Sequence, residues 1–210
     1  MSTYFPSDSD LLRAEIAAAA ARLIAEDGMD YGSAKRKAVK QILGNQKIRG
    51  DVLPDNAAIE EEVRQYQALF FADTQPARLQ HLRELALQIM LQLTPFRPHL
   101  TGAVWNGTAG EHSEIRLHLF ADSPKDVEIY LLNKNIDFDV SESPHSNNRE
   151  APVETLSFLW QHEGVHLTVY ATDDLRNHAR KPVAGKSEHA SIETLRALLD
   201  SLKEQESELK

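Results

Sequence analysis

The residues best suited to chemistry lie in one run, Gly107 to Phe120, which reads Gly-Thr-Ala-Gly-Glu-His-Ser-Glu-Ile-Arg-Leu-His-Leu-Phe. Small residues such as Gly107 and Thr108 let backbone amides approach a phosphate group closely. A carboxylate such as Glu114, at the start of a strand, can hold Mg²⁺ against that phosphate during an in-line displacement. These residue types in this order are what a phosphate-binding turn followed by a metal-binding strand requires.

This run resembles the signature of the polymerase-beta-type nucleotidyltransferase superfamily. In that superfamily a strand ends in Gly followed by Ser, Thr or Gly, the next strand carries two carboxylates at alternate positions, and a later strand carries a third. The resemblance implies a nucleotide or phosphate site at Gly107 and Thr108, with Ser113 and His118 beside it. It also implies that Glu114 is catalytic as the first metal-binding carboxylate.

The run departs from the superfamily pattern at two of its three acidic positions. Arg116 stands at the second position and His166 at the third. A Mg²⁺ ion held by Glu114 alone would depend mainly on phosphate and water. Asp137 and Asp139 could replace the second and third metal-binding carboxylates, or they form the solvent-exposed face of an edge strand. Arg116 is either a catalytic phosphate clamp in place of a carboxylate or an exposed strand arginine, and both interpretations stay open.

The whole chain is also similar to a group of proteobacterial proteins described as nucleotidyltransferase-like. The shared segments are Asp30 to Ala38, Leu53 to Asn56, Gly107 to Ser123, and Leu167 to Tyr170 followed by Arg176. This resemblance implies a protein that binds a nucleotide or a phosphorylated small molecule, with Mg²⁺ as its cofactor if the site is catalytic. The alternative is a non-catalytic regulator or adaptor that kept the fold and lost the metal site.

A local cluster of basic residues is the surface that such an adaptor would use, together with the acidic C-terminal tail. The cluster contains Lys35, Arg36, Lys37, Lys40, Lys47 and Arg49. It could meet the phosphates of a nucleic acid. No aromatic residue lies among these charges, as single-strand binding would require, so we favour a solvated helix face over a nucleic-acid interface.

The run His162-Glu163-Gly164-Val165-His166 matches the H-E-x-x-H pattern of zinc peptidases. That chemistry needs a helix, on which the two histidines meet one metal ion and the glutamate activates its water. The residues from Val165 onward alternate with period two, and Gly164 lies inside the motif, so we expect a hairpin. His178 does not fit as a third ligand at any standard spacing. A zinc peptidase is therefore the third hypothesis, after the two above.

A fragment of a second phosphate-binding motif occurs at Gly185-Lys186-Ser187. A complete P-loop needs a glycine five positions before Gly185, because its backbone amides must wrap the phosphates. That position is Arg180. We therefore expect a surface loop here.

Composition limits the classes of protein that this chain can belong to. It has 23 Lys and Arg against 32 Asp and Glu, a formal net charge of −9, and no cysteine. Disulfides and thiolate metal sites are thereby excluded, and a general attraction to nucleic acid is absent. The longest apolar stretch, Ile16 to Ala21, is far shorter than the roughly 20 residues that span a bilayer. We expect a cytoplasmic protein without a membrane span.

The elements that must position these residues fall into two parts, a helical region over residues 1–94 and an α+β domain over residues 95–210. Helices are predicted at Asp10 to Ala25, Ser33 to Leu43, Asp55 to Phe70, Thr74 to Leu93, Pro124 to Asn135 and Ser191 to Glu206. Strands are predicted at Leu100 to Trp105, Ile115 to Phe120, Ile136 to Val140, Thr155 to Gln161 and Val165 to Ala171. The last two strands should form a hairpin around Glu163-Gly164, and the third and fourth helices should pair with each other. The expected fold is a nucleotidyltransferase-like antiparallel or mixed sheet with a crossing helix and a C-terminal helix, on which the N-terminal helices pack.

Overall fold

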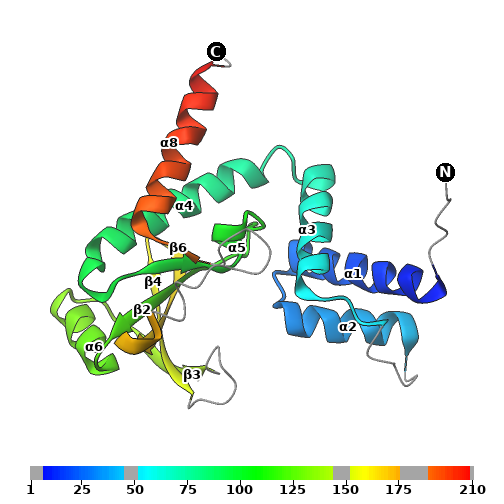
Figure 1. The fold of residues 1–210 in the computed structure, drawn as a ribbon. Coiled ribbons are helices and arrows are strands. Elements are labelled where there is room, and N and C mark those ends of the chain that lie inside the picture. Colours follow the sequence, from blue (N-terminus) through cyan, green and yellow to red (C-terminus); the bar gives the residue numbers. More distant parts are fainter. Residues whose placement is uncertain (1–6, 45–51, 144–151, 176–188, 209–210) are drawn as a thin grey trace. The chain divides into compact units, whose positions relative to one another are not determined.

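The computed structural model describes residues 7–44, 52–143, 152–175 and 189–208, and it divides the chain into two compact units. The first unit is Met1–Ala77 with Gly110–His112, and the second is Arg78–Ala109 with Ser113–Lys210. Over the described residues the chain forms seven α-helices and one six-stranded mixed sheet (Figure 1). The predicted α+β class is confirmed. None of the described helices is long and apolar enough to cross a bilayer.

The elements follow one another as a block of helices, then strands with helices between them, then a C-terminal helix. The helices are α1 (Asp8–Asp27), α2 (Tyr31–Leu43), α3 (Asn56–Phe70), α4 (Gln75–Gln92), α5 (Gly102–Asn106), α6 (Pro124–Asn133) and α8 (Ile192–Glu208), with 3₁₀ turns at Thr94–Phe96 and Thr172–Asp174. The strands are β1 (His99–Thr101), β2 (Ile115–Ala121), β3 (Asp139–Ser143), β4 (Val153–Trp160), β5 (Glu163–Ala171) and β6 (His189–Ala190).

The first unit is built from α1, α2 and α3, and each of these helices begins at a side-chain cap. Ser7 and Asp10 form a reciprocal capping box at the start of α1. Asp30 accepts a hydrogen bond from the backbone amide of Ser33 at the start of α2, and Asp55 accepts one from the backbone amide of Ala58 at the start of α3. These caps satisfy amide groups that the first helical turn leaves without partners.

The three helices of the first unit bury a core of their own. Its buried side chains are small or β-branched: Ile16, Ala17, Ala20, Ala21, Ala34, Ala38, Ile59 and Val63. Because alanine side chains are short, the helix backbones can approach each other closely at these positions. The first unit therefore has a core of its own, while Leu69 and Phe70 at the end of α3 are exposed.

Helix α4 contributes to a different core from α3. Its buried residues, among them Leu82, Leu85 and Ile89, lie in one apolar cluster with residues of the sheet. The buried residues of α3 lie in the cluster of the first unit. The buried side chains of α3 and α4 therefore belong to two different cores, and the two units divide near Ala77, whereas the sequence predicted a boundary at residue 94.

The sheet has the strand order β3-β4-β5-β2-β1-β6. Its central neighbours β5 and β2 run parallel, and the other neighbouring pairs run antiparallel. The parallel pair joins strands that are far apart in sequence, whereas β4 and β5 form a local hairpin. The mixed sheet expected from the sequence is present.

The two faces of the sheet differ in character. Alternate residues of β2, β4 and β5, such as Leu117, Leu156 and Leu167, are buried in one core with residues of α4, α6 and α8. The residues between them on β2 and β5, such as Arg116 and His166, point to the opposite face because side chains alternate along a strand. This second face carries the side chains that could bind a ligand or take part in a reaction.

Three elements differ from the sequence prediction. The strand expected from Leu100 to Trp105 ends at Thr101, and the short helix α5 follows it. Gly102 and Gly107, which bound α5, have positive φ angles of 69° and 94°, a backbone conformation that glycine adopts without strain. The strand expected from Ile136 begins only at β3, and β6 was not predicted.

The hairpin of β4 and β5 is confirmed, but its turn lies earlier than expected. Trp160 pairs with Glu163, so Gln161 and His162 form a two-residue turn. Their φ angles are 49° and 71°. Two positive φ angles in succession are the conformation of a type I′ hairpin turn.

Candidate functional site

The site is a row of side chains that crosses the polar face of the sheet. Asp139 of β3 pairs with Ser157 of β4, which pairs with His166 of β5. His166 in turn lies beside Arg116 of β2, which pairs with Thr101 of β1. Residues directly opposite each other on neighbouring strands point to the same face. Five strands therefore place an acid, a hydroxyl, an imidazole, a guanidinium and a second hydroxyl side by side.

Three of the side chains in and beside this row form a hydrogen-bonded chain. The Nε2 atom of His166 lies 2.7 Å from Oε2 of Glu114, and its Nδ1 atom lies 2.8 Å from Oγ of Ser157. A carboxylate accepts hydrogen bonds, so these contacts assign the ring proton to Nε2 and leave Nδ1 to accept from the serine. Glu114 thereby orients the imidazole and fixes its tautomer.

Arg116 and Gly164 complete the surroundings of Glu114. The Nη2 atom of Arg116 lies 3.7 Å from Oε2 of Glu114, so one carboxylate faces both the guanidinium and the imidazole. A Cβ atom on residue 164 would lie 2.9 Å from Oε1 of Glu114. Glycine at this position leaves the space that the carboxylate occupies.

An open cavity of about 750 Å³ adjoins the hydrogen-bonded chain. Glu114, His166 and Ser157 all line it, and Asp137 and Trp160 line it as well. The side chains of Glu114 and His166 are 44% and 24% exposed. A ligand in the cavity can therefore reach the serine and the imidazole.

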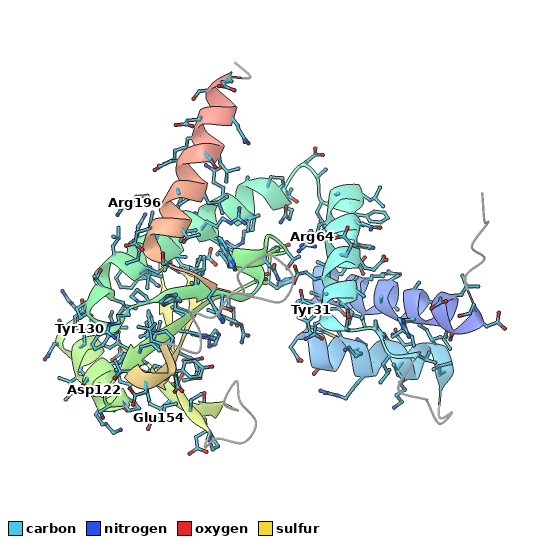
Figure 2. The ribbon with its side chains drawn as sticks, viewed as in Figure 1. Tyr31, Arg64, Asp122, Tyr130, Glu154 and Arg196 are labelled. Carbon is cyan, nitrogen blue, oxygen red and sulfur yellow. The ribbon has the colours of Figure 1, made fainter. Side chains whose placement is uncertain are left out.

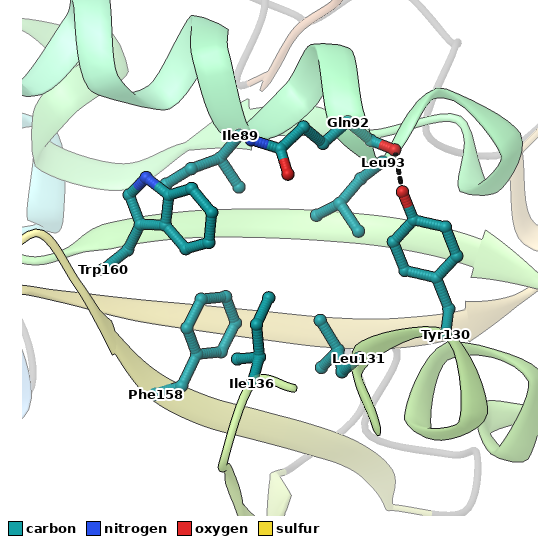
Figure 3. A pocket seen from close by; sticks show the side chains of 8 residues that line it. All are labelled: Ile89, Gln92, Leu93, Tyr130, Leu131, Ile136, Phe158 and Trp160. Carbon is teal, nitrogen blue, oxygen red and sulfur yellow. Dashed lines mark hydrogen bonds between the residues drawn. The ribbon is translucent and has the colours of Figure 1, made fainter. Parts of the chain in front are cut away.

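A second, much smaller cavity lies between α4, α6 and the sheet (Figure 3). It has room for about 10 Å³, and Ile136, Phe158 and Trp160 line both cavities. Tyr130 of α6 (Figure 2) donates a hydrogen bond to the carbonyl of Gln92 at 2.7 Å beside this cavity (Figure 3). A space of this size holds at most about one water molecule, so it is a packing defect rather than a binding site.

The residues of the predicted phosphate turn, Gly107 and Thr108, lie at the end of α5 and have partners inside the fold. Thr108 is buried, and both its backbone amide and its hydroxyl donate to Oδ1 of Asn106, at 3.0 and 2.7 Å. Gly107 ends α5, and the guanidinium of Arg83 donates to the carbonyls of Val104 and Trp105 in its last turn. Burial lowers the pKa of Arg83. The hydroxyl of Thr108 is thus turned to an internal partner.

The other predicted nucleotide-binding residues lie at different places. His118 follows Arg116 on the polar face of β2, and its ring packs 4.8 Å from that of Tyr170 and 4.9 Å from that of His189. Ser113 is half-buried in the loop before β2. The structure therefore brings Glu114, Arg116 and His118 to one region of the polar face.

The predicted metal ligands do not form a cluster. Asp139 begins β3, whereas Asp137 precedes that strand, and both line the open cavity. Among the described residues, no group of three or more His, Asp or Glu side chains is placed to hold a metal ion. Glu114 is engaged by a guanidinium and an imidazole. This donor set does not fit the oxygen-rich coordination that Mg²⁺ requires.

The H-E-x-x-H residues lie on a hairpin and not on a helix. His162 is in the turn and His166 is in the polar row. The carboxylate of Glu163 accepts hydrogen bonds from both terminal nitrogens of Arg78, one of them at 2.6 Å, and His81 lies 3.4 Å away. These hydrogen bonds from Arg78 hold the pKa of Glu163 below its usual range. Glu163 is therefore half of an ion pair between α4 and β5.

The basic cluster on α2 is largely engaged by neighbouring groups. Lys35 reaches Asn56, Arg36 reaches Ser33, and Lys37 pairs with Asp27 at 3.6 Å: these are contacts within the first unit. Of these three contacts, only that of Lys37 with Asp27 places an opposite charge beside the cation, because Asn56 and Ser33 are neutral. Several residues that the sequence singled out lie outside the described residues: Lys47, Arg49, Arg176, His178, Arg180 and Gly185-Lys186-Ser187.

Comparison with known proteins adds no family to this geometry. No family model matches the chain, and no curated protein matches its sequence.

Sequence reasoning missed Ser157, which the hairpin register places opposite His166. The signal that could have found it is the position of the turn, since the two turn residues determine which residues of β4 and β5 face each other.

Proposed function

We propose that this chain is a nucleotidyltransferase-like protein that binds a nucleotide or a phosphorylated small molecule over the polar row. The observation that carries this proposal is the convergence of Glu114, Arg116 and His166. These are the three positions at which the resemblance expects a metal-binding trio, and two of them hold side chains that can be positively charged. A guanidinium binds phosphate oxygens through two parallel hydrogen bonds. Arg116, 59% exposed, is available for this role.

The proposed binding uses the chain's own charges instead of a bound Mg²⁺ ion. An arginine in place of a carboxylate changes how the site can bind the negative charge of a phosphate. The guanidinium attracts phosphate oxygens directly, whereas a carboxylate needs a metal ion between itself and the phosphate. His166, held by Glu114, is the group at this site that can accept a proton. The absence of cysteine is compatible with a reducing compartment, and we propose a cytoplasmic location for this function.

The test is calorimetric titration of the full chain with ATP, GTP, CTP and UTP and with sugar phosphates, each with and without Mg²⁺. We expect one of these ligands to bind, with a similar affinity in both conditions. Arg116→Ala should weaken that binding about tenfold or more, because a hydrogen bond to a charged group contributes about 1.5–3 kcal/mol. Arg196→Ala, which removes an exposed arginine of α8 (Figure 2), is the matched control and should bind as the native chain does.

Two results would contradict the proposal. In one, no phosphorylated ligand binds under any condition. In the other, binding is found but is equally strong in Arg116→Ala, which would place the ligand elsewhere on the chain. Binding that appears only with Mg²⁺ would show that the metal-independent account of the site is wrong.

A further inference from the structure

Ser157 is held in the geometry of an activated nucleophile. Its Oγ atom lies 2.8 Å from Nδ1 of His166, and Nε2 of the same ring lies 2.7 Å from the carboxylate of Glu114. A nucleophile, a base and a group that orients the base, each within hydrogen-bonding distance of the next, are the three parts that covalent catalysis by a hydroxyl needs. The three residues come from two strands and the segment before a third.

This arrangement is more than a means of satisfying buried polar groups. The carboxylate of Glu114 and the ring of His166 are partly exposed, so water could serve as their hydrogen-bonding partner. Ser157 and His166 line the open cavity of about 750 Å³, so a substrate can approach them. Gly164 adds a further observation, since any side chain there would collide with Glu114 in its present position.

We propose that Ser157 is a nucleophile that accepts a phosphorus-linked group, with His166 as its general base and Glu114 as the residue that positions His166. The proposal rests on the proposed function for its choice of electrophile, a phosphoanhydride such as a nucleoside triphosphate. β4 is paired with strands on both sides, so its backbone amides serve the sheet and do not form the pair of free donors that acyl transfer uses. The guanidinium of Arg116 suits phosphate oxygens instead.

The reaction balances with the residues present and two co-reactants, the phosphoanhydride and an acceptor hydroxyl. In the first step Oγ of Ser157 forms a bond to the α-phosphorus, its proton passes to Nδ1 of His166, and the bond from the α-phosphorus to the bridging oxygen breaks with its electron pair on the leaving pyrophosphate. His166 then releases the proton to that pyrophosphate. In the second step the acceptor hydroxyl attacks phosphorus and gives its proton to Nδ1, and Oγ leaves and takes that proton back.

The experiment uses two probes on the full chain. A fluorophosphonate ester forms an Oγ–phosphorus bond with loss of fluoride and reports an activated serine without requiring nucleotide binding. The four nucleoside triphosphates, labelled at the α-phosphorus, report the proposed reaction itself. Peptide mass analysis locates each adduct. We expect both probes to label Ser157 and Ser157→Ala to remain unlabelled.

The variants separate a chemical role from a structural one. Labelling should slow at least 100-fold in His166→Gly, the range that general-base catalysis supplies, and added imidazole should restore at least a tenth of the native rate. Glu114→Gln should slow labelling without abolishing it, because the amide still holds the ring. Ser141→Ala is the matched control, since Ser141 lies on β3 and its hydroxyl reaches the carbonyl of Thr155. It should be labelled as the native chain is.

The outcomes distinguish this proposal from the proposed function. If a nucleotide binds in the calorimeter but neither probe labels Ser157, the nucleophile proposal is wrong and the binding proposal stands. If the fluorophosphonate labels Ser157 but no phosphorylated ligand binds, the choice of electrophile and the proposed function are both wrong. Labelling at the native rate in His166→Gly without imidazole would overturn the role given to His166.

Discussion

Replacing Glu163 by glutamine should destabilise the second unit by about 2 kcal/mol at pH 7. The side chains of Glu163 and Arg78 are 15% and 25% exposed, so the burial of their ion pair is intermediate between that of exposed pairs and that of fully buried pairs. Exposed pairs contribute less than about 1 kcal/mol, whereas removal of one partner from a fully buried pair costs about 3–5 kcal/mol. The chain's two tryptophans, Trp105 and Trp160, both belong to the second unit. Tryptophan fluorescence during urea unfolding therefore reports on this unit.

The loss of stability in Glu163→Gln should depend on pH with a definite sign. Hydrogen bonds from Arg78 lower the pKa of Glu163, so its carboxylate stabilises the folded state fully above the ordinary glutamate pKa of about 4.3. That contribution is lost as the pH falls through the lowered folded pKa. The difference in free energy of unfolding between the native chain and Glu163→Gln should therefore be constant from about pH 8 to 5 and should disappear at lower pH.

Glu128→Gln is the matched control for this prediction. Glu128 pairs with Lys125 one helical turn away, and Lys125 is 67% exposed, so the urea midpoint should change little. An unchanged midpoint in Glu163→Gln at pH 7 would refute the reasoning from burial. A difference in unfolding free energy between the two chains that persists at pH 3 would refute the electrostatic explanation of that difference. Either result would reopen a chemical role for this glutamate.

Three further predictions concern stability. Thr108→Val should lower the free energy of unfolding by about 1 kcal/mol in urea without a selective loss of ligand binding, because its hydroxyl bonds to Asn106 inside the fold. Ser7→Ala should cost about 1 kcal/mol by removing the cap of α1, which faster amide exchange in that helix would reveal. Gln161→Asn combined with His162→Gly should stabilise the β4–β5 hairpin by about 1 kcal/mol, seen as a higher melting temperature, because these residues suit positive φ angles.

The helices were predictable because their signals are local. Asp55 followed by apolar residues at helical spacing indicated α3, and Ser123 with Pro124 indicated α6. Strand β2 was equally clear, since Ile115, Leu117 and Leu119 are buried whereas Arg116 and His118 between them are not. Each of these features depends on residues within a few positions of one another.

The helix α5 could not be predicted in the same way. The segment from Leu100 to Trp105 is rich in residues typical of strands, which predicted a longer β1. In the structure its chain turns at Gly102, and Arg83 from α4 binds the carbonyls at the end of the helix. The contact that stabilises this conformation comes from a residue distant in sequence, and a local pattern does not contain it.

The candidate site was predictable in part. The resemblance to the nucleotidyltransferase signature related Glu114, Arg116 and His166 as the three expected acidic positions, and the parallel register places the last two side by side. The nucleophile was missed because the turn was placed two residues late. A turn at Glu163-Gly164 would put Gln161 opposite His166, whereas the turn at Gln161-His162 puts Ser157 there.

The parallel pairing of β2 with β5 has a consequence for the order in which the chain acquires its site. Ser157 and His166 are 9 residues apart and meet when the β4–β5 hairpin forms, which takes about 1–10 μs in isolated hairpins. Glu114 and His166 are 52 residues apart and meet only when the central strands join. During synthesis at roughly 5–20 residues per second, Glu114 is present for about 3–10 s before His166 exists. The contact between Glu114 and His166 is therefore a marker of the joining of the two central strands, and a ribosome-bound chain that stops before β5 carries the carboxylate without its imidazole.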